Sequence, residues 1–262
     1  MGSTGASKSS SSSYGSYPTR DAAVSAFEQN TGVKITFNYN DDKVITKTNL
    51  AMVLDTVADM KKRFPQQLQW LKSVGSYMQK PRRNGGLSMA QASTSNDIAF
   101  NEYVFSMHNP QLNKLYDSST SGNTPYHPKG TTAKDIITHE LGHIMFSGYI
   151  RRINRRLANH DMFDLYDASQ WVRSKGLRGG TGITATHIKN KVDQALRNAL
   201  GATPTSKNVL RYANPRYGSS IAVSGYAATN IHELFAESVA DYVANGVKAS
   251  PLSKEIVKIL HL

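Results

Sequence analysis

Apolar side chains recur with two different periods along the chain, and these periods predict both strands and helices. Every second residue is apolar over 33–39, which predicts a half-buried strand, and residues 97–105 predict another. Apolar positions three and four residues apart predict helices over 50–64, 68–78 and 188–200. The first of these helices is followed by Pro65 and the last by Gly201, and both residues are typical of the end of a helix.

Two further segments combine helical spacing with residues that start or end a helix. Thr132 and Asp135 resemble a capping box, and apolar residues then recur at helical spacing up to position 144. Asn230 suits the N-cap of a second helix, and Gly246 suits a left-handed residue just beyond its end. We expect these strands and helices to form a fold of the α+β class with a small mixed sheet and a C-terminal helical part.

Composition divides the chain into a tail and one domain. Residues 1–19 are rich in Ser and Gly and predict a flexible tail. Residues 20–80 predict a mainly helical part of the domain, and a turn rich in Pro and Gly follows over 81–86. Residues 96–262 form the predicted core, with an insertion at about 147–220.

Composition also excludes several classes of protein. With 262 residues, of which 39 % are hydrophobic, the chain can bury one good core. It contains no Cys, so disulfides and thiolate metal ligands are excluded. No apolar run is long enough for a membrane span, and the N-terminus lacks the apolar core of a signal peptide. We therefore expect no membrane partner, and the lack of Cys fits an intracellular or virion protein.

A net charge of +12 raises the question of a nucleic-acid partner. The densest basic cluster, over residues 149–157, places four arginines on one stripe of a predicted helix: Arg151, Arg152, Arg155 and Arg156. That stripe could make non-specific contacts with phosphates. A solvated face of an amphipathic helix explains the same pattern and is the preferred interpretation, because no nucleic-acid-binding motif accompanies it.

The sequence His139-Glu140-Leu-Gly-His143 carries the clearest chemistry. Positions i and i+4 share one face of a helix, so His139 and His143 can bind one metal ion, which predicts Zn²⁺ as the cofactor. Glu140 lies one step away from that face, where a carboxylate can deprotonate a metal-bound water. We expect the other histidines to be surface or loop residues or, for His232, to point away: His108, His127, His160, His187, His232 and His261.

A catalytic zinc site needs a third protein ligand and keeps its fourth position open. The predicted helix after Asn230 supplies Glu233 and, one turn later, Glu237. One carboxylate can bind the metal while the other orients a ligand histidine through its second nitrogen. We assign the metal to Glu233 and the orienting role to Glu237.

These residues carry a family resemblance. A histidine pair of this spacing with a later Glu ligand is similar to the gluzincin metallopeptidases. The stretch from Tyr226 to Glu237 resembles the active-site helix of anthrax lethal factor and of related phage-encoded peptidase domains. The lead-in from His127 to His139 resembles that of such domains in phage head proteins. The resemblance is specific over about 125–145 and 221–243 and faint elsewhere.

The resemblance implies a fold and a function. The implied fold is zincin-like, with the strand over 97–105 lining the cleft beside the active-site helix. The implied function is a zinc-dependent metalloendopeptidase in which Glu140 is the general base and Tyr226 donates a hydrogen bond to the oxyanion. A phage origin follows from the same likeness, and with it a location in a virion or in the host cytoplasm, with secretion by another route left open. The alternative is a virion structural or DNA-associated protein with a vestigial or structural zinc site.

Overall fold

A small mixed sheet and a set of helices make up the part of the chain that the structure describes, so the predicted α+β class is confirmed. The structure is a computed structural model, and the residues it describes are 13–83, 87–93, 96–154, 180–206 and 208–262.

The sheet has the strand order β1-β2-β4-β3. Its strands are β1 (Lys34–Ile35), β2 (Ser73–Tyr77), β3 (Ala90–Ala92) and β4 (Asp97–Asn101). β1 and β4 both pair parallel with β2, and β3 pairs antiparallel with β4. Val74 lies opposite Ile98 in the register, and both are buried, so the middle of the sheet belongs to the hydrophobic core.

The helices are α1 (Arg20–Thr31), α2 (Lys47–Arg63), α3 (Glu102–Phe105), α4 (Asn109–Thr120), α5 (Asp135–Ile153), α7 (Gly180–Leu200), α8 (Val209–Ala213), α9 (Ile231–Asn245) and α10 (Pro251–Ile259). The predicted helix over 50–64 is confirmed by α2, which begins after an N-cap in which the Thr46 hydroxyl accepts a hydrogen bond from Asn49 N–H. The helix predicted for 188–200 is confirmed by α7, and Gly201 follows it with a φ of 66°.

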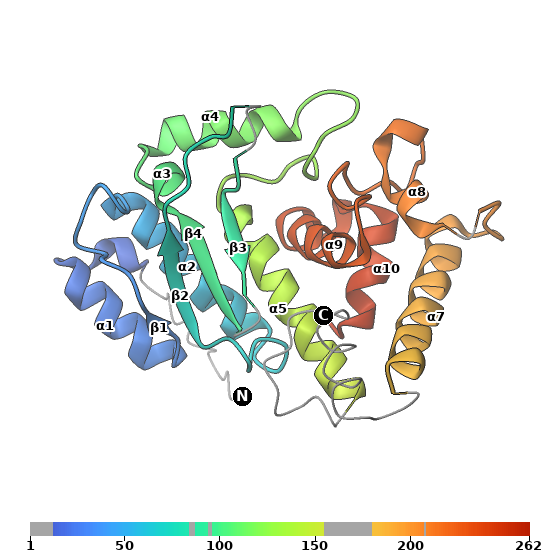
Figure 1. The fold of residues 1–262 in the computed structure, drawn as a ribbon, viewed down its shortest axis with the longest axis horizontal. Coiled ribbons are helices and arrows are strands. Elements are labelled where there is room, and N and C mark those ends of the chain that lie inside the picture. Colours follow the sequence, from blue (N-terminus) through green and yellow to red (C-terminus); the bar gives the residue numbers. More distant parts are fainter. Residues whose placement is uncertain (1–12, 84–86, 94–95, 155–179, 207) are drawn as a thin grey trace, which may run out of the picture.

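Helix α5 lies in the middle of the molecule. It packs against β3 and β4 on one side and against α9 on the other, and α2 also contacts it. Figure 1 shows the sheet and the N-terminal helices on one side of α5, with α9, α10 and α7 on the opposite side. Most of α5 is buried as a result, including the polar residues on it that carry the chemistry.

The helix predicted for 68–78 is wrong. Leu68 lies in a turn, Leu71 follows that turn without regular structure, and Val74 belongs to β2, which has a parallel neighbour on each side. A Cβ on Gly75 would approach the hydroxyl of Thr36, the residue directly after β1, to 3.1 Å. A glycine at position 75 therefore leaves room for this neighbouring segment. The apolar spacing over 68–78 is compatible with a helix and with a strand. Pairing with β1 and β4, which are distant in sequence, favours the strand.

Both predicted strands are shorter than expected. In the segment 33–39 only Lys34–Ile35 is strand, and the ring of Phe37 turns onto Phe100, with centroids 4.7 Å apart. In the segment 97–105 the strand ends at Asn101, whose side chain accepts a hydrogen bond from Tyr103 N–H and starts α3. A side-chain cap therefore converts the second half of this predicted strand into a helical turn.

The sheet crosses the predicted domain boundaries. β2 precedes the turn at 81–86, and β3 precedes residue 96, yet both are part of the sheet that contains β4. Residues 147–153 belong to the last turns of α5, so the described part of the predicted insertion begins inside this helix. Of the predicted flexible tail over 1–19, residues 1–12 lie outside the described residues. The rest is packed on the domain, because Tyr14 is buried and its N–H donates a hydrogen bond to Asp55 on α2.

Candidate metal centre

Three ligand-type atoms converge between α5 and α9. The Nε2 atoms of His139 and His143 are 3.2 Å apart. The Glu233 Oε2 atom lies 3.1 Å from the first of these nitrogens and 3.3 Å from the second. The group is buried, and it could bind a metal ion.

The two helices bring these residues together by an unusually close approach. Both histidines lie on α5, one turn apart, and Glu233 lies in the first turn of α9, where Asn230 caps the helix by accepting a hydrogen bond from Glu233 N–H. A Cβ on Gly142 would lie 2.8 Å from the Ala236 Cα, so only a glycine lets the two backbones meet here. The glycine between the two histidines is therefore part of the site's construction.

The donor set fits a zinc ion. Around a tetrahedral ion with bonds of about 2.0–2.1 Å, ligand atoms are about 3.3–3.4 Å apart, close to the observed spacing. Glu233 Oε2 is buried and has no hydrogen bond of normal geometry from the described residues. Two imidazoles and one carboxylate suit zinc, although iron also accepts this set.

The charges in the group are complementary. Burial acts to raise the pKa of Glu233, but the close contacts of its carboxylate with the imidazoles of His139 and His143, and their charge, lower it well below its usual range. Burial acts to lower the pKa of His139, and the carboxylates of Glu233 and Glu237 raise it well above its usual value. Glu233 is therefore ionised at neutral pH, and a metal ion would compete with a proton at His139.

Glu140 lies on the wall of the same site. Its side chain is buried, and the backbone N–H of Ala92 on β3 interacts with its carboxylate. Burial raises the pKa of Glu140, while the two neighbouring histidines act against that shift. A carboxylate with a raised pKa beside a metal group is suited to taking up and releasing a proton.

Tyr226 lies against the ligand His139. The two rings are stacked, with centroids 5.5 Å apart and an angle of 10° between their planes. Two backbone hydrogen bonds fix its loop, from Gly225 N–H to Pro125 O and from Tyr226 N–H to Tyr126 O. Burial and the Glu233 carboxylate raise the pKa of Tyr226, so its hydroxyl remains protonated and can donate a hydrogen bond.

Glu237 lies behind the ligands, as the sequence predicts. Its Oε1 atom lies 2.7 Å from His139 Nδ1, so it bonds the nitrogen that faces away from the metal group. The same oxygen lies 2.9 Å from His127 Nδ1, and Oε2 accepts a hydrogen bond from the Ser224 hydroxyl. His127 lies in a loop and is not one of the three ligand-type residues, as expected, but its contact with Glu237 is not foreseen from the sequence. His127 precedes its partner by 110 residues, and no periodicity connects the two positions.

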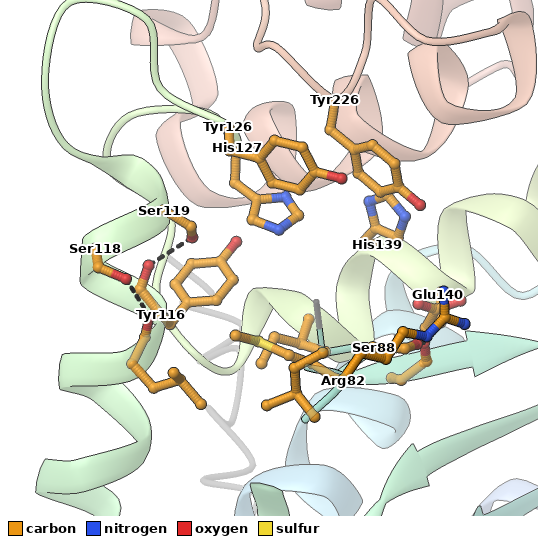
Figure 2. Close-up of a pocket in the computed structure, with 15 residues that line it drawn as sticks. Arg82, Ser88, Tyr116, Ser118, Ser119, Tyr126, His127, His139, Glu140 and Tyr226 are labelled. Atoms are coloured by element: carbon orange, nitrogen blue, oxygen red, sulfur yellow. Dashed lines mark hydrogen bonds between the residues drawn. The ribbon is translucent and has the colours of Figure 1, made fainter. Parts of the chain in front are cut away.

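A cavity of about 440 Å³ opens beside the metal group. In Figure 2 the rings of Tyr116, His127, Tyr126, Tyr226 and His139 lie next to one another along its wall, and Glu140 lies beyond His139. The rest of the lining is both apolar and polar: Leu87, Met89, Ala90, Leu115 and Ile136, with Arg82, Ser88, Ser118 and Ser119. A second hollow brings the metal group together with the β3 residues Ala90, Gln91 and Ala92.

The strand that borders the site is β3, and the assignment of the cleft edge to 97–105 is wrong. β4 lies inside the sheet, between β2 and β3. β3 pairs only with β4 among the described strands, so its other edge faces the site. β3 consists of only three residues, two of them alanines, so its sequence gives little indication of a strand. Only the strand order of the sheet shows that β3 is the edge strand beside the site.

The predicted basic stripe is not formed as expected. Arg151 is 1 % exposed, donates a hydrogen bond to Asn96 Oδ1 and lies over the ring of Trp70. Arg152 is partly buried beside Tyr149. Arg155 and Arg156 lie outside the described residues. Arg151 is consequently buried in the core and is not part of an exposed basic stripe.

Comparison of the chain with protein-family models, with curated proteins and with solved structures finds no match. Among the described residues, none of the helices is both long and apolar enough to cross a membrane.

Proposed function

We propose that this protein is a zinc-dependent metalloendopeptidase. The observation that carries the proposal is the buried triangle of His139 Nε2, His143 Nε2 and Glu233 Oε2, with Glu140 beside it and a cavity open to it. When bound, zinc supplies an acidic water and polarises a carbonyl group. The zincin-like fold and the phage origin remain proposals that rest on the resemblance of the sequence motifs.

The residues around the triangle support a role for each in peptide hydrolysis. Glu140 would accept a proton from the attacking water and deliver it to the leaving amine, and its raised pKa suits both steps. Tyr226 would donate its hydroxyl proton in a hydrogen bond to the oxygen on which negative charge develops. The free edge of β3 would pair with the backbone of an extended peptide, which gives affinity without fixing the sequence.

A structural zinc site is the less well supported alternative. Structural sites usually have four protein ligands, whereas the described residues bring three such groups together. The neighbouring cavity favours access by a substrate, because a purely structural ion needs none. The burial of Arg151 also removes one of the arginines on which a DNA-associated role was based.

The deciding experiment separates binding from chemistry. Wild type should contain one zinc per chain, and His143→Ala should lose it. Glu140→Gln should keep the zinc but hydrolyse a broad peptide library roughly 10²–10⁴-fold more slowly, which is the range for loss of a general base. Absence of zinc from freshly purified wild type, or equal turnover in wild type and Glu140→Gln, would contradict the proposal.

A further inference from the structure

His127 is attached to the metal centre through a shared oxygen. Its Nδ1 and the Nδ1 of His139 lie 2.9 and 2.7 Å from the same atom, Glu237 Oε1. The Glu237 side chain is 1 % exposed and that of His127 is 17 % exposed, so little water reaches this contact. A neutral His127 with its proton on Nδ1 satisfies the geometry as a donor to the carboxylate.

The other oxygen of Glu237 is attached to the loop that carries Tyr226. Ser224 Oγ donates to Glu237 Oε2 at 2.7 Å and accepts from Ala227 N–H at 2.9 Å. Glu237 therefore has three partners from three separate segments of the chain. Without His127, the Oε1 atom of Glu237 would have a single contact, from His139. The additional contact from His127 restricts rotation of the carboxylate.

His127 is itself fixed in place. Its ring is stacked on Tyr116, with centroids 5.2 Å apart, and the Tyr116 hydroxyl lies 3.1 Å from Thr131 Oγ1 in a buried contact. Figure 2 shows the ring between Tyr116 and Tyr226 at the wall of the cavity. His127 could therefore act in two ways: its ring could pack against Tyr116, or its Nδ1 could position Glu237. The two roles predict that different substitutions of His127 lower the zinc affinity.

We propose that His127 is a positioning residue of the metal centre: it holds Glu237 so that Glu237 fixes the ring of His139 and thereby raises the affinity for zinc. The inference rests on the proposed zinc site. Loss of a group that orients a metal ligand typically lowers metal affinity about 10–100-fold, which sets the size of the expected effect.

Two substitutions separate the hydrogen bond from the ring. His127→Phe keeps a ring on Tyr116 but has no donor, while His127→Asn keeps a donor near the Nδ1 position but loses the ring. Zinc affinity, measured at neutral pH by competition with a chromophoric chelator, should fall at least about tenfold in His127→Phe and stay within about threefold of wild type in His127→Asn. The reverse order, or wild-type affinity in both variants, would overturn the proposal.

Further measurements guard against misfolding and against failure of the underlying site. His108→Phe makes the same exchange at an exposed histidine without a side-chain cap and serves as a matched control with unchanged zinc affinity. If His127→Phe does not fold, His127→Ala replaces it, and equal affinities of the Ala and Asn variants overturn the idea. The visible spectrum of the cobalt-substituted protein should change in the Phe or Ala variant alone. Wild type without metal would instead contradict the proposed function itself.

Discussion

At the scale of single residues, Glu237 gives stability a pH dependence with a defined sign. Burial acts to raise the pKa of Glu237, but its bonds to His127 and His139 lower it from 4.5 to about 2. A lowered pKa in the folded state means that the carboxylate stabilises the fold fully above pH 4.5, and that this contribution is lost as the pH falls toward 2.

Urea unfolding of the chelator-treated protein checks this dependence. The difference in unfolding free energy between wild type and Glu237→Gln should be largest above pH 4.5 and should shrink as the pH is lowered below it. A difference that stays constant from pH 6 to pH 3 would show that Glu237 has no lowered pKa.

Tyr226 allows a second prediction at this scale. Its ring packs on His139 and Tyr126, and only its hydroxyl is proposed to act on the substrate. Tyr226→Phe should therefore keep the fold and the zinc, because the ring is retained, while peptide hydrolysis falls roughly 10²–10³-fold. Turnover within about threefold of wild type would remove the hydroxyl from the mechanism, and the metal ligands would be unaffected by that result.

At the scale of elements, the crossing of α5 and α9 depends on Gly142. Alanine is the better helix former by about 1 kcal/mol, so a substitution without contacts would stabilise α5. Here the added Cβ would meet the Ala236 backbone, and backbone cannot move aside as a flexible side chain can. Gly142→Ala should cost about 1–3 kcal/mol and weaken zinc binding, because α9 carries Glu233.

Gly148→Ala provides the matched control on the same helix. A Cβ on Gly148 would meet the Trp70 side chain, which belongs to the N-terminal part of the chain, and would not meet α9. Some stability should be lost, but zinc affinity, measured by chelator competition, should stay at the wild-type value. Equal zinc affinity in both alanine variants would show that the helix crossing does not set the ligand geometry.

The sequence predicts elements well where local signals agree with distant contacts. α9 combines an N-cap at Asn230, apolar spacing and a glycine beyond its end, and the structure contains a helix with these bounds. The segment 68–78 fails because its helical spacing competes with pairing to β1 and β4, which no local pattern encodes. His127 is missed for a similar reason, since its partner Glu237 is distant in sequence and its loop has no period.

At the scale of the whole molecule, the proposed metal would join two halves of the chain. His139 and His143 lie on the helix next to the sheet, and Glu233 lies on the helix that packs against α10. Binding to the folded state alone adds about 2.7 kcal/mol of stability at a free zinc concentration one hundred times Kd. The melting temperature of wild type should therefore rise on addition of zinc to the chelator-treated protein.

His143→Ala should show no such rise, because it lacks one ligand of the group. His261→Ala replaces an exposed histidine and should respond like wild type. Thermal unfolding followed by circular dichroism measures all three proteins. A zinc-dependent rise that persists in His143→Ala would place the binding elsewhere on the chain.

The parallel pairing of β2 with β4 also determines how the protein can be divided for expression. A fragment beginning at residue 96 retains β4 and all three proposed ligands but lacks both neighbours of that strand. Two rows of backbone donors and acceptors would then be exposed on a strand with buried apolar side chains, and such strands pair with other copies and aggregate. Fragments for biochemical work should therefore begin before β1, even when only the proposed catalytic residues are of interest.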